Sequence, residues 1–245
     1  MTTLDVVLLL VGGLAAGFIN ALAGGGSAIT IPIMTEIVGV NVANGTNRIA
    51  ILLANASALT RFQRGGAVPW GSVTRLIPPT VIGAAVGAWV ATQISGDVMK
   101  RVFAVVLVIV AASVLLRPAR WVEGRERQIA EPWRSLAFFG IGFYGGSVQA
   151  GVGFLLLIGL VLGSGMDLVR GNAAKVVLIL AYTPVALLLF ASAAQVDVKV
   201  GLVLSAGQMT GAWIGARFAV LKGAAWVRWV LVAAAIVAAL RFLLT

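Results

Sequence analysis

Apolar runs recur along the whole chain with only short polar connections between them. Four of them, Leu76–Val90, Val102–Leu116, Lys175–Ala194 and Val227–Leu240, approach or reach the ~20 residues that cross a ~30 Å hydrocarbon core. Hydrophobic residues make up 60% of the chain, against roughly 45–50% in soluble domains. No soluble domain remains once the runs are subtracted. We therefore predict an all-α integral membrane protein, because helices satisfy their own backbone hydrogen bonds in lipid.

The absence of two residue types excludes several kinds of catalytic and metal-binding site. The 245 residues include no cysteine and no histidine, which removes disulfides, thiolate nucleophiles, zinc sites and imidazole relays. We expect no cofactor and no bound metal. The net charge of +10 comes from Lys and Arg residues scattered through short connections, which indicates topology signals and lipid contact rather than nucleic-acid binding.

The apolar runs fall into two groups separated by a polar stretch. The first run could be a cleaved signal peptide, but no basic residue precedes it and Asp5 lies there, so we interpret it as a span. We predict a first transmembrane repeat over 1–117, a polar linker loop over 118–133 and a second transmembrane repeat over 134–245. The predicted runs are 4–22, 27–38, 45–62, 73–93 and 98–116, then 134–163, 172–194, 199–220 and 225–244.

Three sequence matches relate the two groups at a nearly constant offset. "GAAVGAWV" at Gly83 corresponds to "GQMTGAWI" at Gly207, and "GFINALAGGG" at Gly17 corresponds to "GFYGGSVQAGVG" at Gly142. "NGTNR" and "GNAAK" align Arg48 with Lys175. The matches indicate a duplicated unit. The Gly-x-x-x-Gly spacing in the first pair favours close helix packing over a functional role.

Residues 20–32, "NALAGGGSAITIP", interrupt an apolar run with poor helix formers. Each glycine is about 1 kcal/mol worse than alanine inside a helix, and Pro32 removes another hydrogen bond. Broken helices in duplicated halves are typical of the central site of a transporter. A short helix that starts at Ser27 would point its positive end at an anion. The alternative is an ordinary turn outside the membrane.

A second polar segment, Asn41–Arg48, precedes the next span and is interpreted as a turn at a helix start. Asn44 or Thr46 could serve there as an N-cap. Arg48 would lie in the first turn, where a cation either reaches the lipid head groups or marks a ligand path. Its repeat mate Lys175 favours a ligand path, and two cations beside helix N-termini suit a small oxyanion.

With these motifs the chain resembles the TauE/SafE family of sulfite and organosulfonate exporters. The resemblance rests on the triple glycine, "NGT" at Asn44, "RGGAVPW" at Arg64 and "GAAVGAWV" with the run that follows, and it covers nearly the whole chain. It implies a bacterial inner-membrane, multi-pass protein of about eight helices in two related halves. Two departures concern the substrate: family members often have serine after "GT", where this chain has Asn47, and the second half lacks the triple glycine. In the second half, Gln149 and Asn172 are the expected hydrogen-bond donors to the substrate.

The leading hypothesis is a secondary transporter that exports a small anion, sulfite or an organosulfonate, by alternating access. A passive anion channel and, with less support, a membrane-embedded enzyme remain as alternatives. The expected partners are the small anion and the lipid bilayer, with a homodimer left open and no nucleic acid. The residues expected to line the substrate site are Gly24, Gly25, Gly26, Ser27, Asn44, Thr46, Asn47, Arg48, Gln149, Gly151, Gly153, Asn172 and Lys175.

Two further points stay open in the sequence. Glu36 could carry a proton at depth, or it could be an interfacial carboxylate. If 27–38 is part of a broken element, the N-terminus, the linker and the C-terminus share one face, and the arginines of the linker favour the cytoplasm. If 27–38 is an extra crossing, the two halves become inverted.

Overall fold

The computed structural model describes residues 1–22, 24–103, 105 and 129–244, with only the backbone described for 222–244. These residues are helical with short connections, which confirms the expected all-α class. Three helical stretches of the described residues are long and apolar enough to cross a membrane: Thr3–Leu22, Trp70–Gln93 and Leu168–Ser192. The elements are α1 (Thr3–Leu22), α2 (Ser27–Val38), α3 (Val40–Arg64), α4 (Trp70–Val73), η1 (Thr74–Leu76), α5 (Ile77–Gln93), α7 (Trp133–Ser147), α8 (Val152–Val161), α9 (Leu168–Ser192) and α10 (Val198–Leu244).

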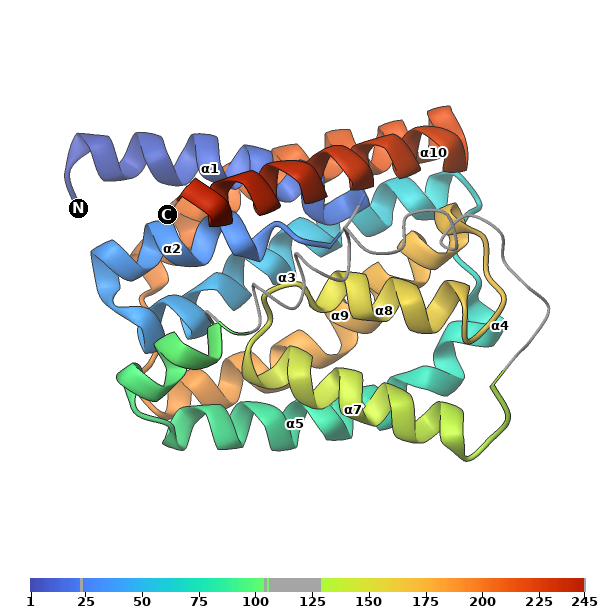
Figure 1. Cartoon of the computed structure of the whole chain (residues 1–245), viewed down its shortest axis with the longest axis horizontal. Helices are drawn as coiled ribbons and strands as arrows, with labels where there is room; N and C mark the ends of the chain where they lie inside the picture. Colours follow the sequence, from blue (N-terminus) through green and yellow to red (C-terminus); the bar gives the residue numbers. More distant parts are fainter. Residues whose placement is uncertain (23, 104, 106–128, 245) are drawn as a thin grey trace.

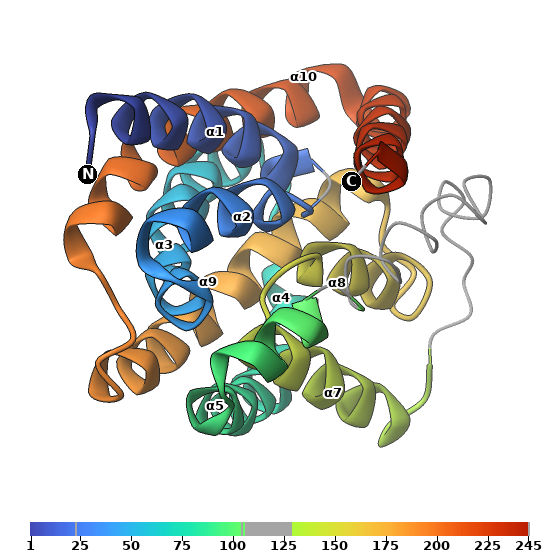
Figure 2. The ribbon, with the colours of Figure 1, turned by 60° about the vertical axis from the view of Figure 1, so that its left-hand side comes forward.

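The helices form three layers. Figures 1 and 2 show α1 with α10 on one side, α5 with α7 on the other, and α2, α3, α8 and α9 between them. Most of the buried polar side chains of the described residues belong to the middle layer, and α3 alone buries Asn44, Thr46, Asn47, Arg48 and Asn55. The outer layers therefore lie on either side of these polar groups (Figures 1 and 2).

In each outer layer, the two helices approach each other closely at glycines. A Cβ on Gly207 or Gly211 of α10 would lie 2.2 or 2.0 Å from a carbonyl oxygen of α1. In the other outer layer, a Cβ on Gly83 or Gly87 of α5 would lie 2.0 Å from a carbonyl oxygen of α7. Backbones this close leave no room for a side chain, so the predicted Gly-x-x-x-Gly packing seams are confirmed.

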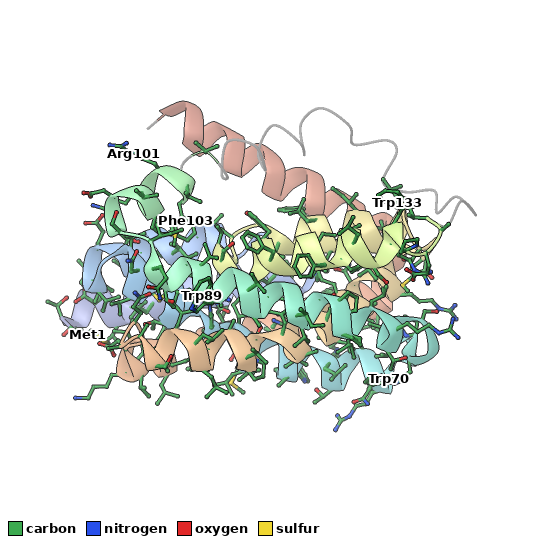
Figure 3. The ribbon with its side chains drawn as sticks, turned by 90° about the horizontal axis from the view of Figure 1, so that it is seen from below. Met1, Trp70, Trp89, Arg101, Phe103 and Trp133 are labelled. Carbon is green, nitrogen blue, oxygen red and sulfur yellow. The ribbon has the colours of Figure 1, made fainter. Side chains whose placement is uncertain are left out.

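Met1 and Trp133 lie at opposite ends of the molecule (Figure 3), and we call these the Met1 end and the Trp133 end. Helix α1 begins at the first and α7 begins at the second, so these two helices run in opposite directions (Figure 1). The helices α2 and α8 both begin near the middle and run to opposite ends. Of the two alternatives left open in the sequence, the one in which the N-terminus and the linker share one face is therefore wrong, because Met1 and Trp133, the last residue of the linker, lie at opposite ends (Figure 3).

Several helix boundaries differ from the predicted runs. The run 134–163 is divided into α7 and α8 at residues 148–151, where Gln149 and Gly151 have φ values of 64° and 75°. The runs 199–220 and 225–244 form one helix, α10, because a single glycine at 223 does not end helical hydrogen bonding. The ribbon nevertheless changes direction within α10 (Figure 2). Much of run 98–116, and residues 118–128 of the linker, lie outside the described residues.

The predicted turn over Asn41–Arg48 is wrong. Gly39, with a φ of 77°, ends α2 and also precedes α3, which begins at Val40 and continues through the polar segment. Its polar side chains find partners inside the protein instead of competing for the local backbone, so they tolerate a helical conformation. Arg48 therefore lies in the third turn of α3, away from the helix start.

Candidate functional site

The two chain interruptions meet at the centre of the molecule. A Cβ added to Gly24, between α1 and α2, would lie 2.3 Å from the Cα of Gly153 in the first turn of α8, and one added to Gly153 would lie 2.2 Å from the Cα of Gly24. Gly25 is placed against the ring of Phe154, the next residue of α8. The starts of α2 and α8 are therefore in direct contact. The first amides of each helix lack intrahelical acceptors, so both positive helix ends lie at this centre.

Polar side chains of α2 and α3 hold the start of α2 in place. The Asn47 amide donates to Ser27 Oγ at 3.1 Å, and its Oδ1 accepts from Thr30 Oγ1 at 2.9 Å. Asn20, near the end of α1, accepts from the amide of Gly26 at 3.1 Å. A Cβ on Gly26 would lie 2.2 Å from the carbonyl oxygen of Ala16, so only glycine fits there. This network fixes the start of α2 in the interior of the protein, where Ser27, Thr30 and Asn47 are buried.

Arg48 is completely buried and reaches the end of α7. Its Nη1 donates to the carbonyl of Gly145 and to Gln149 Oε1, both at 3.1 Å, and its Nη2 donates to the carbonyl of Gly146. Its guanidinium lies 4.4 Å from the ring centroid of Phe190. The cation therefore satisfies free carbonyls at the negative end of α7.

Lys175 is also completely buried and makes the matching contact with α1. Its Nζ donates to the carbonyl of Asn20 at 2.8 Å and to Asn172 Oδ1 at 2.7 Å. Arg48 on α3 thus contacts the helix that ends before one interruption, and Lys175 on α9 contacts the helix that ends before the other.

No carboxylate of the described residues neutralises either cation. The ion pairs of these residues join Arg134 to Glu131 and Arg170 to Asp167. An uncompensated buried ion costs several kcal/mol, and carbonyl dipoles offset only part of that cost. The site therefore has an electropositive centre.

Two buried hydrogen-bond donors, one on Arg48 itself and one beside Lys175, have no acceptor among the described residues. Arg48 Nε and Asn172 Nδ2 are buried and make no hydrogen bond to the described residues. The Asn172 amide is oriented by Lys175, which occupies its oxygen. Unpaired buried donors are uncommon in folded proteins, and they suit a ligand that brings acceptor oxygens.

Other predicted site residues have different positions. Thr46 Oγ1 accepts from the backbone amide of Asp197 at 2.8 Å, which places it at the start of α10 instead of the centre. Asn44 is buried and donates to the carbonyl of Ser147 at 2.7 Å, while its Oδ1 has no partner among the described residues. Glu36 is exposed, two residues before the end of α2. Gly151, in the left-handed conformation, precedes α8 directly.

We expect Thr46→Val to leave the apparent affinity for substrate unchanged. The variant loses the acceptor for the Asp197 amide, which is a local contact worth about 1 kcal/mol. Transport kinetics and thermal unfolding of the purified variant test this expectation together. A large rise in KM with an unchanged Tm would place Thr46 in the substrate site after all.

Three residues of the centre were missed in the sequence. Asn20 contacts both the start of α2 and Lys175, Thr30 donates to Asn47, and the hydroxyl of Tyr182 donates to Gln149 Oε1 at 3.2 Å. Asn20 had a usable signal, since it is a lone polar residue in an apolar run just before the glycines. Nothing in the sequence marked Thr30 or Tyr182 as a site residue, because both residue types are common in apolar helices.

These features define a class: an α-helical membrane protein with a polar, cationic centre formed by interrupted helices. Residues 9–242 match the family described as Sulfite exporter TauE/SafE. The chain belongs to this family, as the sequence motifs predicted.

Curated relatives of the chain are named as probable membrane transporters. The chain is 32% identical over 241 residues to "Probable membrane transporter protein ORF9" of Sinorhizobium sp, covering 97% of this chain and 92% of the relative. It is 29% identical over 211 residues to "Probable membrane transporter protein YfcA" of Escherichia coli (strain K12), covering 85% and 78% of the two chains. A "Probable membrane transporter protein" of Haemophilus influenzae is 29% identical, with coverage of 88% and 86%. No solved structure gives a significant match.

Proposed function

We propose that this protein is a secondary transporter that exports a small anion, sulfite or an organosulfonate, across the bacterial inner membrane. The observation that carries the proposal is the pair of fully buried cations, Arg48 and Lys175, for which the described residues supply no carboxylate. A small oxyanion would neutralise this charge and would accept hydrogen bonds from Arg48 Nε and Asn172 Nδ2. The name of the family agrees with this substrate class.

The proposal includes an architecture of about eight spans in two related halves of opposite orientation. Four observations support it: the sequence matches, the opposite directions of α1 and α7, the paired starts of α2 and α8, and the equivalent contacts of Arg48 and Lys175. Inverted repeats with interrupted helices at the midplane are the usual basis of alternating access. Rocking of one half against the other would then expose the central site to each face in turn.

Flux through proteoliposomes tests the proposal with a panel of sulfite, sulfate, sulfoacetate, thiosulfate and acetate. We expect saturable flux and counterflow for sulfite or sulfoacetate, with little acetate flux. Conductance that does not saturate would identify a passive anion channel. Consumption of a substrate without flux would identify an enzyme, and absence of flux for the whole panel would contradict the substrate class.

A further inference from the structure

A cavity of about 280 Å³ lies along one face of α2. The lining residues of α2 follow helical spacing: Ser27, Ala28, Ile31, Pro32, Thr35 and Glu36. The cavity continues onto Lys100 and Phe103 of the helical segment that follows α5. One water molecule takes ~30 Å³ of liquid volume, so the cavity has room for a hydrated small anion.

The inner end of this cavity lies at the candidate site. Ser27 Oγ accepts from Asn47, the residue before Arg48, and Ala150 follows Gln149, which accepts from Arg48. The outer end lies at the Met1 end, where Figure 3 places Phe103 and Arg101. Glu36 and Lys100 have opposite charges at this mouth, whereas the inner end is cationic. The potential therefore becomes more favourable to an anion toward the centre.

Within the described residues, the corresponding helix α8 is more fully buried than α2. Seven of the ten residues of α8 are buried, including Leu156, Leu157 and Leu160, whereas four of the twelve residues of α2 are buried. The two helices begin in contact with each other and run to opposite ends. Among the described residues, the structure is thus more open beside α2 than around α8, as expected for one state of an alternating-access carrier.

Charge is distributed unequally between the two ends of the molecule. In the described side chains, the helix ends and connections at the Met1 end carry four acidic groups, Asp5, Glu36, Asp97 and Asp197, and three basic ones, Lys100, Arg101 and Lys199. Those at the Trp133 end carry two acidic groups, Glu131 and Asp167, and five basic ones, Arg61, Arg64, Arg75, Arg134 and Arg170. Cytoplasmic loops of membrane proteins are enriched in Lys and Arg. The Trp133 end is therefore assigned to the cytoplasm.

From these observations we infer that the cavity along α2 is the passage between the central site and the periplasm for a small oxyanion. The described structure is open to the periplasm and closed toward the cytoplasm, with the N-terminus outside. This inference rests on the proposed function and deepens it, because it assigns the residues along the exit route and the direction of that route.

Substituted cysteines test the passage directly, because the natural chain has no cysteine and gives no background labelling. Ala28→Cys and Thr35→Cys place thiols at two depths of the cavity, and Leu157→Cys on the packed helix α8 is the matched control. The full-length variants are labelled with the anionic, membrane-impermeant sulfonatoethyl methanethiosulfonate in spheroplasts and in inverted inner-membrane vesicles. Sulfoacetate serves as the competing ligand, because sulfite itself cleaves the adduct.

We expect both cavity thiols to react in spheroplasts at least about tenfold faster than the Leu157→Cys thiol, and sulfoacetate to slow the reaction at position 28. Two positions are used so that misfolding of one variant leaves the other as the test. Labelling of both thiols only in inverted vesicles, or at the rate of the control, would overturn the inference and leave the proposed function standing. Outside labelling that sulfoacetate does not slow, with no flux in the anion panel, would support the opening and contradict the proposed function.

Discussion

Replacement of Arg48 by glutamine is expected to reduce anion flux by about 100-fold, equivalent to about 2.7 kcal/mol. Glutamine removes the buried positive charge but keeps an amide that can donate toward the carbonyls of Gly145 and Gly146. The loss should therefore appear in transport more than in folding, because the amide replaces part of the contact with the end of α7 but none of the charge. Initial rates of sulfite or sulfoacetate flux, normalised to reconstituted protein, measure the effect.

Lys175→Gln should give a loss of similar size, because Lys175 occupies the equivalent place at the end of α1. Arg170→Gln is the matched control: its side chain is exposed and lies 3.9 Å from Asp167. Exposed ion pairs contribute little, so its flux should stay within about twofold of the natural chain. If Arg48→Gln and Lys175→Gln each transported as fast as the natural chain, neither cation would belong to the substrate site.

Arg48→Lys separates the charge from the helix-capping contacts. Lysine keeps the positive charge, but its single nitrogen cannot copy the forked contact with Gly145, Gly146 and Gln149. We expect its flux to lie between those of the natural chain and Arg48→Gln. Equal losses in the lysine and glutamine variants, with equal falls in Tm, would indicate that Arg48 acts only as a cap for α7.

Much of the candidate site could be predicted from local sequence because its residue types are costly in lipid. Consecutive glycines at Gly24–Gly26 and cations at Arg48 and Lys175 are unfavourable in a simple span, so the glycines, and the cations at matching positions of the two halves, indicated a common centre. The structure places both interruptions in contact and both cations at the ends of interrupted helices. That these groups bind substrate stays a prediction.

The parts that could not be predicted depend on partners distant in sequence. Asn44 and Thr46 could each cap a helix, but Asn44 donates to Ser147 and Thr46 accepts from Asp197, more than 100 residues away. The same partners allow α3 to begin before the polar segment. Orientation was also undetermined, because a 12-residue apolar run is too short to decide between a crossing and an interruption.

The second large effect is expected at the contact between the two interruptions. Gly153→Ala places a methyl group 2.2 Å from the Cα of Gly24, where the neighbour is backbone and cannot rotate away. Overpacking that requires backbone movement costs about 3 kcal/mol or more, which should lower Tm by about 10 °C. Thermal unfolding in detergent, read by size-exclusion chromatography, measures the change.

Gly140→Ala is the control for this variant, because Gly140 lies in α7 with open space where its Cβ would be. That substitution should leave flux unchanged and raise stability by up to about 1 kcal/mol, since alanine is the better helix former. The two glycine variants therefore shift Tm in opposite directions if α2 and α8 start in contact. Equal Tm values for Gly153→Ala and the natural chain would mean that the two helix starts lie further apart in the membrane. The inverted arrangement around a shared centre would then lose its main support.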